Sequence, residues 1–348
     1  MGCKHPLKGF KIGINPETGK NILKITGYLA DHVEKTPDGK LIVVNDNTHA
    51  PANISYNDFV DIPCGKCDGC RLSRAKQKTD RAVLELPYCD SAYFLTITYD
   101  EDHVPKSEYI NPVTGEYAES LTLKKEDLQG FFKRLRSQIS YYDPDRKIRM
   151  CSAGEYGETT RRPHYHSIVF NLKIPDLKFY TITNNDDVLY TSEWLNSIWK
   201  KGNIWIGEVT YKSIAYVNRY ITKKCGDSEK EYYSTFNIVP EFYVASNRPG
   251  IGRQYYEDHK DDLFKEVRYY FPMGDGVGSA SPSRYFFNLF EGDFDAVLVK
   301  AKKDDLKANF ESRKAIKLEH TSQNYLDLLK TEEYNLKCRT KKLSRDKI

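Results

Sequence analysis

Residues 161–170 read Arg161-Arg162-Pro163-His164-Tyr165-His166-Ser167-Ile168-Val169-Phe170, and this stretch decides the fold that we expect. We interpret it as a β-strand. Because successive side chains point to opposite faces of a strand, His164 and His166 share one face while Tyr165 points away. Two imidazoles on one face can hold one metal ion, although two histidines on the solvent face of a strand are the commoner meaning of this tripeptide.

The residues before this strand predict an acidic partner for the histidines. Residues 151–158 end an apolar-alternating run, and the Thr-Thr-Arg-Arg-Pro segment that follows is typical of a hairpin turn. Antiparallel pairing would bring Glu155, or as second choice Glu158, beside the imidazoles, because the register is open by a residue or more. Two nitrogens and one carboxylate leave open positions on Mg²⁺ or Mn²⁺, where phosphate oxygens can bind.

A pair of tyrosines follows some fifty residues later. After a predicted strand at 203–209, apolar residues recur at helical spacing, and Tyr216 and Tyr220 lie four apart on one helix face. Their Cβ atoms would be roughly 5–6 Å apart, so either hydroxyl can reach one metal-bound phosphate. The alternative is an aromatic stripe that faces the core. The neighbouring Lys223 and Lys224 favour the phosphate interpretation, since cations screen phosphate.

Three of the eight cysteines form a compact motif, Cys64-x2-Cys67-x2-Cys70. This spacing suits a metal better than disulfides. A tetrahedral Zn²⁺ needs four ligands, and Cys3 or His5 can supply the fourth. The alternatives are reduced cysteines that pack a loop, or a site that loads an iron–sulfur cluster in error.

Several blocks together resemble the His-hydrophobe-His (HUH) endonucleases, and more closely the replication initiator proteins of microviruses, in their gokushovirus branch. The order and spacing of these blocks cover about residues 60–290. They are Pro63-Cys64-Gly65-Lys66-Cys67-Asp68-Gly69-Cys70-Arg71, Phe94-Leu95-Thr96-Ile97-Thr98-Tyr99, Gly154-Glu155-Tyr156-Gly157 with Arg162-Pro163-His164-Tyr165-His166, Tyr216-x3-Tyr220, Arg248-Pro249-Gly250-Ile251-Gly252 and Ser283-Arg284-Tyr285.

The resemblance implies a five-stranded central sheet with both histidines on a middle strand. It also implies a metal-dependent nickase in which Tyr216 or Tyr220 attacks single-stranded phage DNA at the origin and forms a 5′-phosphotyrosine with a free 3′-OH. The role implied is initiation and termination of rolling-circle replication in a bacterial host cytoplasm. No Gly-x4-Gly-Lys-Ser/Thr loop is present in the sequence, so strand separation is expected to rely on supercoiling or a host helicase.

The order of predicted elements indicates the α+β class, an antiparallel sheet with packed helices. We expect a basic helix from Leu72 to Glu85, a strand from Ala92 to Thr98, and a helix capped by Thr122 that runs to about Ile139. The apolar stripe of this last helix consists of Leu128, Phe131, Phe132, Leu135 and Ile139.

Composition predicts four segments in the 348 residues. They are a β-rich flap with the cysteine knuckle (1–70), the endonuclease core (71–228), an aromatic-rich accessory segment (229–292) and a charged helical tail (293–348). No apolar run has the length of a membrane span and no signal-peptide core begins the chain. The net charge is only +4, so DNA contacts must be local. The candidates are Arg161, Arg162, Lys223 and Lys224.

Two other classes stay open. A related transposase or plasmid relaxase could use the same metal and tyrosine chemistry on other DNA. A zinc-bearing, non-enzymatic single-stranded DNA-binding protein could carry the two histidines as structural residues. Phenylalanine at positions 216 and 220 would separate the enzyme from the binding protein, since only the enzyme has cleavage to lose.

Overall fold

The computed structural model describes residues 2–157, 159–184, 186–219, 227–266, 268–273 and 276–342. They fall into two compact units, one formed by residues up to 73 together with 316–342, the other by 74–315. The four segments expected from composition stay a prediction. Across the described ranges, no helix is both long and apolar enough to cross a bilayer.

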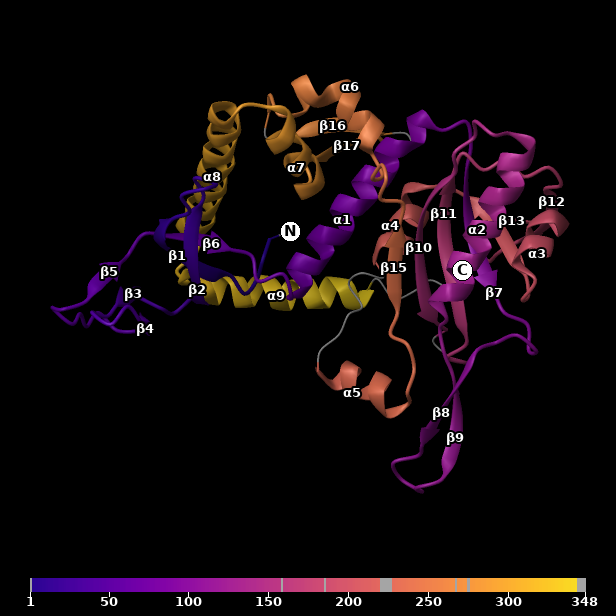
Figure 1. Ribbon diagram of the computed structural model, residues 1–348, viewed down its shortest axis with the longest axis horizontal. Helices are drawn as coiled ribbons and strands as arrows, with labels where there is room; N and C mark the ends of the chain where they lie inside the picture. Colours follow the sequence, from indigo (N-terminus) through magenta and orange to yellow (C-terminus); the bar gives the residue numbers. More distant parts are fainter. Residues whose placement is uncertain are drawn as a thin grey trace. The chain divides into compact units, whose positions relative to one another are not determined.

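The second unit is built on an antiparallel sheet of seven strands in the order β12-β13-β14-β7-β11-β10-β15 (Figure 1). The strands are β7 (Ala92–Thr98), β10 (Arg149–Tyr156), β11 (Pro163–Phe170), β12 (Lys178–Ile182), β13 (Val188–Thr191), β14 (Ile204–Glu208) and β15 (Phe242–Ala245). This sheet and its helices confirm the α+β class. The bounds of β7 are those predicted.

The sheet is wider than the five strands expected, and the way its strands pair shows why. Ladders of several residue pairs join β14, β7, β11, β10 and β15, and they place β11 in the middle of five strands. By contrast, β13 joins β14 through the single pair of Tyr190 with Ile206. The β12–β13 hairpin, which sequence periodicity did not predict, therefore extends a five-stranded core at one edge.

One face of the sheet is covered by α2 (Lys125–Tyr142) and α3 (Glu193–Trp199) (Figure 1). The buried residues of α2 are the five predicted: Leu128, Phe131, Phe132, Leu135 and Ile139. Burying each of these side chains stabilises the folded state by roughly 1.5–3 kcal/mol. The predicted cap was wrong. Lys124 precedes the helix without a side-chain cap, and the Thr122 hydroxyl instead accepts a hydrogen bond from the backbone N–H of Val239 at 3.0 Å.

The opposite face packs against α1 (Asp68–Glu85) and α4 (Tyr211–Arg219). Residues of these helices, such as Val83 and Val217, share a buried cluster with Ile168 of β11. The helix α1 begins at Asp68, four residues before the predicted start. The reason is the cysteine turn, which leads directly into the helix, with Arg71 N donating to the carbonyl of Cys67 at 3.0 Å.

The Arg-Pro-Gly-Ile-Gly block has a structural role against α1. The backbone N–H of Gly252 donates to buried Glu85 at 2.6 Å, and Arg81 Nε donates to the carbonyl of Ile251 at 2.9 Å. A Cβ at Gly250 would lie 2.6 Å from the Tyr285 hydroxyl oxygen, so any other residue there would have to displace the Tyr285 side chain. The Arg-Pro-Gly-Ile-Gly block and the Ser-Arg-Tyr block thus both contact α1. The surrounding elements are α6 (Arg253–Leu263), β16 (Tyr269–Met273), β17 (Gly276–Ala280) and α7 (Arg284–Asp293).

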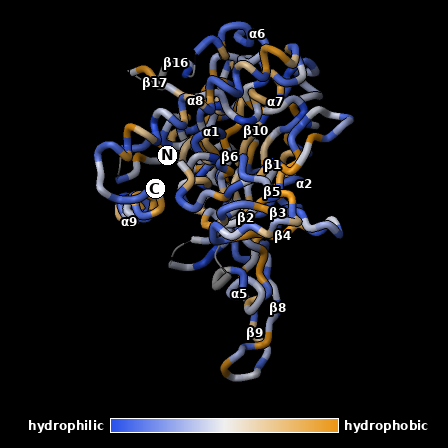
Figure 2. The backbone as a smooth tube through the Cα atoms, turned by 90° about the vertical axis from the view of Figure 1, so that its left-hand side faces the viewer, coloured by the Kyte–Doolittle hydropathy of each residue, from blue (hydrophilic) through white to orange (hydrophobic). Residues whose placement is uncertain are grey.

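A two-stranded arm of β8 (Lys106–Ile110) and β9 (Tyr117–Leu121) projects from the second unit beside α5 (Asp227–Thr235) (Figure 2). Its base is held by Ser107, whose hydroxyl donates to the carbonyl of Asn237 at 2.6 Å. The ring of Tyr109 also packs against Phe236. The arm was not predicted.

The first unit contains two small sheets, in the orders β2-β1-β6 and β4-β3-β5. Its elements are β1 (Leu7–Ile14), β2 (Asn21–Gly27), β3 (His32–Lys35), β4 (Leu41–Val44), β5 (Ile54–Tyr56), β6 (Phe59–Ile62) and α9 (Tyr325–Lys342); α8 (Ala296–Glu319) belongs to both units in sequence. The turns predicted at 16–19 and 37–39 join β1 to β2 and β3 to β4. The buried apolar cluster of this β-rich part is small: Phe10, Ala30 and Val33.

Candidate metal and tyrosine site

The β10–β11 hairpin brings the predicted ligands together. In its register Glu155 lies directly opposite His164, and Ala153 opposite His166. The turn closes with Gly157 N donating to the carbonyl of Arg162 at 3.0 Å, while Arg161 adopts a left-handed φ of 53°. Glu155 is therefore the carboxylate beside the histidines. The second choice, Glu158, lies outside the described residues.

One carboxylate oxygen is the centre of the group. Glu155 Oε1 lies 2.6 Å from His164 Nε2 and 3.3 Å from His166 Nε2. Glu155 and His166 are only 5% and 4% exposed, so the group is shielded from water on most sides. Buried carboxylates and imidazoles in such contact are a common metal-binding arrangement.

The far nitrogens of both imidazoles are also held. His164 Nδ1 lies 3.1 Å from the carbonyl oxygen of Arg162, and His166 Nδ1 lies 3.1 Å from the Thr96 hydroxyl. If each Nδ1–H donates to its oxygen, the lone pair of each Nε2 becomes available to a cation that replaces the proton shared with Glu155. Such partners fix the tautomer and the ring orientation of metal-binding histidines. The ligand atoms of all three side chains lie within 4.8 Å of one another, so these residues fit a single divalent ion.

The charge of Glu155 suits a cation. Burial by itself would raise the pKa of Glu155, but hydrogen bonds from His164 and His166 outweigh burial and lower this pKa well below its ordinary value. The carboxylate is therefore ionised at neutral pH and can offset part of the charge of a bound ion.

Tyr216 of α4 reaches the same carboxylate. Its hydroxyl donates to Glu155 Oε1 at 3.1 Å. Its ring lies edge-on to the His166 imidazole, with centroids 5.0 Å apart, and the Arg219 guanidinium lies 5.9 Å from its ring centroid. The tyrosine is thus part of the buried face and also presents its polar end to the ligand group. Tyr220 lies outside the described residues.

Two residues of the site, Thr96 and Phe94, belong to a motif block of the resemblance but were not predicted as site residues. Thr96 pairs with His166 across β7 and β11 and contacts its Nδ1. The ring of Phe94 is parallel to the His166 imidazole, with a centroid distance of 5.4 Å. Strand alternation in 92–98 puts both on one face, but only the β7–β11 register shows that this is the histidine face.

The predicted DNA-contacting arginines already have protein partners. The Arg161 guanidinium lies 4.9 Å from the Tyr232 ring centroid. Arg162 forms an ion pair with Glu101 at 2.6 Å and donates to the carbonyl of Tyr99 at 2.9 Å. Lys223 and Lys224 lie outside the described residues.

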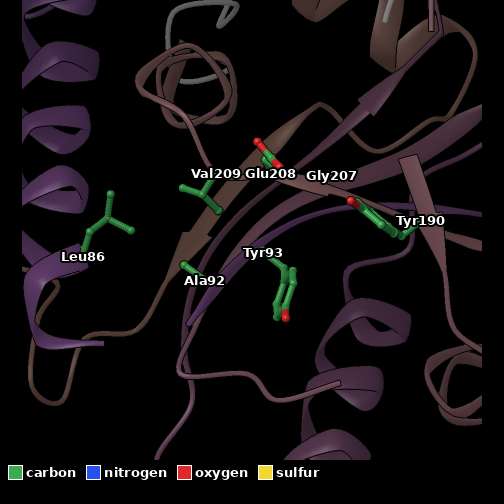
Figure 3. Close-up of a pocket in the computed structure, with 7 residues that line it drawn as sticks. All are labelled: Leu86, Ala92, Tyr93, Tyr190, Gly207, Glu208 and Val209. Carbon is green, nitrogen blue, oxygen red and sulfur yellow. The ribbon is translucent and has the colours of Figure 1, made fainter. Parts of the chain in front are cut away.

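A pocket at the start of β7 is separate from this site (Figure 3). It contains none of Glu155, His164, His166 or Tyr216. Its lining residues are Leu86, Ala92, Tyr93, Tyr190, Gly207, Glu208 and Val209.

Four cysteines of the first unit form a second group that could hold a metal. The sulfur atoms of Cys3, Cys64, Cys67 and Cys70 lie within 4.8 Å of one another. The distance from Cys3 Sγ to Cys67 Sγ is 3.9 Å, close to the edge of about 3.8 Å expected for a tetrahedron with bonds of about 2.3 Å. Backbone N–H groups of Lys4 and Cys64 donate to two of the sulfurs. The residues fit a tetrahedral thiolate site.

The fourth member of this group is Cys3 rather than His5. The imidazole of His5 lies 3.0 Å from Glu333 of α9 and takes no part in the cluster. A Cβ at Gly69 would lie 2.2 Å from the carbonyl oxygen of Gly2, so the N-terminal segment passes very close to the cysteine turn.

Comparisons with known proteins point to phage replication-associated proteins. The family model "Replication-associated protein ORF2/G2P" matches residues 92–225, which include β7, the histidine hairpin and α4. The replication-associated protein VP4 of Bdellovibrio phage phiMH2K is 32% identical over 72% of this chain and 76% of its own length. The replication-associated protein ORF2 of Spiroplasma virus 4 is 30% identical over 84% and 87%. No solved structure matches.

The class of protein is therefore a phage replication-associated protein. More narrowly, the chain belongs to the family of microvirus-type replication initiators, as its resemblance implied.

Proposed function

We propose that this protein nicks single-stranded phage DNA at the replication origin and rejoins it, and so starts and ends rolling-circle replication. The observation that carries the proposal is the meeting of a tyrosine hydroxyl with a two-histidine, one-carboxylate group, Tyr216 on Glu155 Oε1 at 3.1 Å. Membership of a replication-associated family supports the same role.

His164, His166 and Glu155 would hold Mg²⁺ or Mn²⁺. When bound, such an ion would polarise a phosphate oxygen and offset the charge that develops during transfer. The residues of the chain would do the rest. Thr96 and the carbonyl of Arg162 would orient the imidazoles, and Phe94 would fix the ring plane of His166.

In the transfer step, the Tyr216 oxygen would attack phosphorus as the phenol loses its proton. An O–P bond forms to the tyrosine, the P–O3′ bond breaks, and the 3′ oxygen gains a proton. The products are a 5′-phosphotyrosine and a free 3′-OH. Attack by a 3′-OH on this ester reverses the step and reseals DNA without ATP, because the ester conserves the phosphodiester bond energy. Tyr220 would cut the regenerated origin while Tyr216 holds the first end.

The partners follow from this role. A free 3′-OH would prime a polymerase, and a host helicase or supercoiling would separate the strands in the bacterial cytoplasm. Arg161, Arg162, Lys223 and Lys224 would contact phosphates, the two arginines after exchange of their present partners. A Zn²⁺ ion on Cys3, Cys64, Cys67 and Cys70 would serve structure rather than cleavage.

The test uses end-labelled single-stranded fragments that span the phage genome, with purified protein and Mn²⁺ or Mg²⁺. We expect a metal-dependent covalent adduct on the peptide that contains Tyr216 and Tyr220, identified by mass spectrometry. Tyr216→Phe should change the cleavage pattern or remove it, whereas Tyr211→Phe, at the start of the same helix, should not. DNA binding without an adduct on any fragment would contradict the proposal and favour the non-enzymatic binding protein.

A further inference from the structure

A third group of metal-binding side chains lies in the first unit, on β3 and the loop after β4. Its members are His32, Glu34 and His49, whose ligand atoms lie within 4.8 Å of one another. His32 and Glu34 are two residues apart on β3, so they share a face of the strand. Both are buried, at 4% and 2% exposure. The motifs found in the sequence do not include them.

The geometry points to a common centre at Glu34. Its Oε1 lies 3.1 Å from His32 Nε2 and 2.7 Å from His49 Nδ1. Imidazole nitrogens and a carboxylate oxygen that share a tetrahedral zinc ion, with bonds of about 2.0–2.2 Å, are separated by about 3.4 Å, so the His49 ring would move away from Glu34 by less than about 1 Å on binding. A cation would replace the protons that now lie between the rings and this oxygen.

Asp31 supplies the outer partner that metal-binding histidines usually have. Its carboxylate lies 2.9 Å from His32 Nδ1. If this Nδ1–H donates to Asp31, the lone pair of Nε2 becomes available to a cation that replaces the proton shared with Glu34. Carboxylate–histidine–metal chains of this kind raise the basicity of the ligand and fix its tautomer. Glu34 Oε2 is oriented in turn by the Asn53 side-chain amide at 2.6 Å.

The part of the first unit around this group has a small hydrophobic core that a metal cross-link would stabilise. The buried apolar cluster nearby is only Phe10, Ala30 and Val33, and the loop at 45–52 is exposed throughout. Small modules with little core commonly depend on a metal or disulfides for stability. The side chain of His49 is 46% exposed, which leaves an open side where water can complete the coordination.

We propose that His32, Glu34 and His49 bind a zinc-class divalent ion that ties the loop after β4 to β3. Two imidazole nitrogens and one carboxylate oxygen are a ligand set that Zn²⁺ or Co²⁺ accepts, with water in the remaining position. This site is independent of the proposed nicking chemistry. Its role is structural, since the described residues around it include no tyrosine hydroxyl in contact with Glu34.

The experiment measures zinc per chain by elemental mass spectrometry after loading the full-length protein with Zn²⁺ and desalting it. His49→Ala removes one ligand at the exposed side of the group. Asn53→Ala is the matched control, because it removes a hydrogen bond to Glu34 but no ligand atom. The cysteine group and the Glu155 group are common to all three proteins, so a difference reports this cluster. We expect the wild type and Asn53→Ala to hold about one zinc more than His49→Ala.

Equal zinc in all three proteins would overturn the proposal and leave the cluster as a hydrogen-bonded hub around a protonated His32. Circular dichroism shows whether His49→Ala is folded. If it is not, His166→Ala loaded with Co²⁺ decides, because this protein lacks a ligand of the Glu155 group and keeps the His32 cluster. A cobalt band from nitrogen and oxygen ligands, in addition to thiolate-to-cobalt charge transfer, supports the site, and thiolate bands alone would overturn it.

Discussion

The two units each contain a group of two histidines and one glutamate, and the groups differ in what surrounds the carboxylate. Around Glu155 the third contact is the hydroxyl of Tyr216, at the end of a well-packed sheet. Around Glu34 the further contacts are the backbone N–H of Ala50 and the amide of Asn53. In our two proposals, the same ligand types serve a reaction beside the Tyr216 hydroxyl and serve structure beside the hydrogen-bond donors of Ala50 and Asn53.

The largest expected effect comes from removing a ligand of the Glu155 group. His166→Ala should lower metal-dependent nicking on the order of 10³-fold, because several kcal/mol of charge stabilisation is lost. His49→Ala should lower it less than tenfold. Gel assays of labelled origin DNA measure the rates, and filter binding should show DNA affinity much less changed. Equal loss of binding and nicking in His166→Ala would remove the contrast between the two groups.

Metal removal should affect the stability of the first unit more than that of the second. We expect a zinc chelator to speed amide hydrogen exchange in residues 2–73 on the order of 100-fold, since metal binding there adds to folding free energy. Residues 74–315 have the large buried clusters on both sheet faces and should change little. Hydrogen-exchange mass spectrometry measures both. Unchanged exchange in residues 2–73 would show that the first unit does not depend on metal.

A smaller effect is expected at the outer partner of His166. Thr96→Ala should slow nicking about tenfold, because the imidazole loses the hydroxyl that holds its Nδ1. Thr96→Ser keeps that hydroxyl and should restore most of the rate. The control is Thr98→Ala, whose hydroxyl donates to the carbonyl of Asn203 instead. If serine does not rescue, the hydroxyl is not the group that matters.

The smallest effect concerns Lys78 of α1, whose ammonium lies 3.8 Å from the Tyr243 ring centroid on the histidine face of the sheet. Burial, with a contribution from Arg81, lowers the pKa of Lys78 to about 8. The folded state therefore binds its proton less tightly than the unfolded state, and stability rises with pH between about 8 and 10.5.

The corresponding test is Lys78→Met. After a discount for partial exposure, the substitution should stabilise the protein by about 1 kcal/mol at pH 7. The gain should fade as the pH approaches 10, and urea unfolding at several pH values measures it. If the gain in stability did not depend on pH, better packing of the methionine would be its cause instead.

Much of the candidate site followed from local patterns. Alternation placed His164 and His166 on one face, the turn at 159–163 implied a hairpin, and the stripe of α2 was predicted residue by residue. These features depend on periods of 2 and 3.6 residues, which are properties of the chain itself. The resemblance of the motif blocks added the family.

Other features were decided only by the tertiary structure. The choice of Glu155, the contact of Thr96 with His166, the entry of Cys3 into the cysteine group and the His32–Glu34–His49 group all join residues whose distance depends on register and loop path. The width of the sheet, seven strands instead of five, also depends on long-range packing. So does the contact of Thr122 with Val239 in place of the predicted helix cap. Local periodicity determines which face a side chain takes, but long-range packing determines what it meets there.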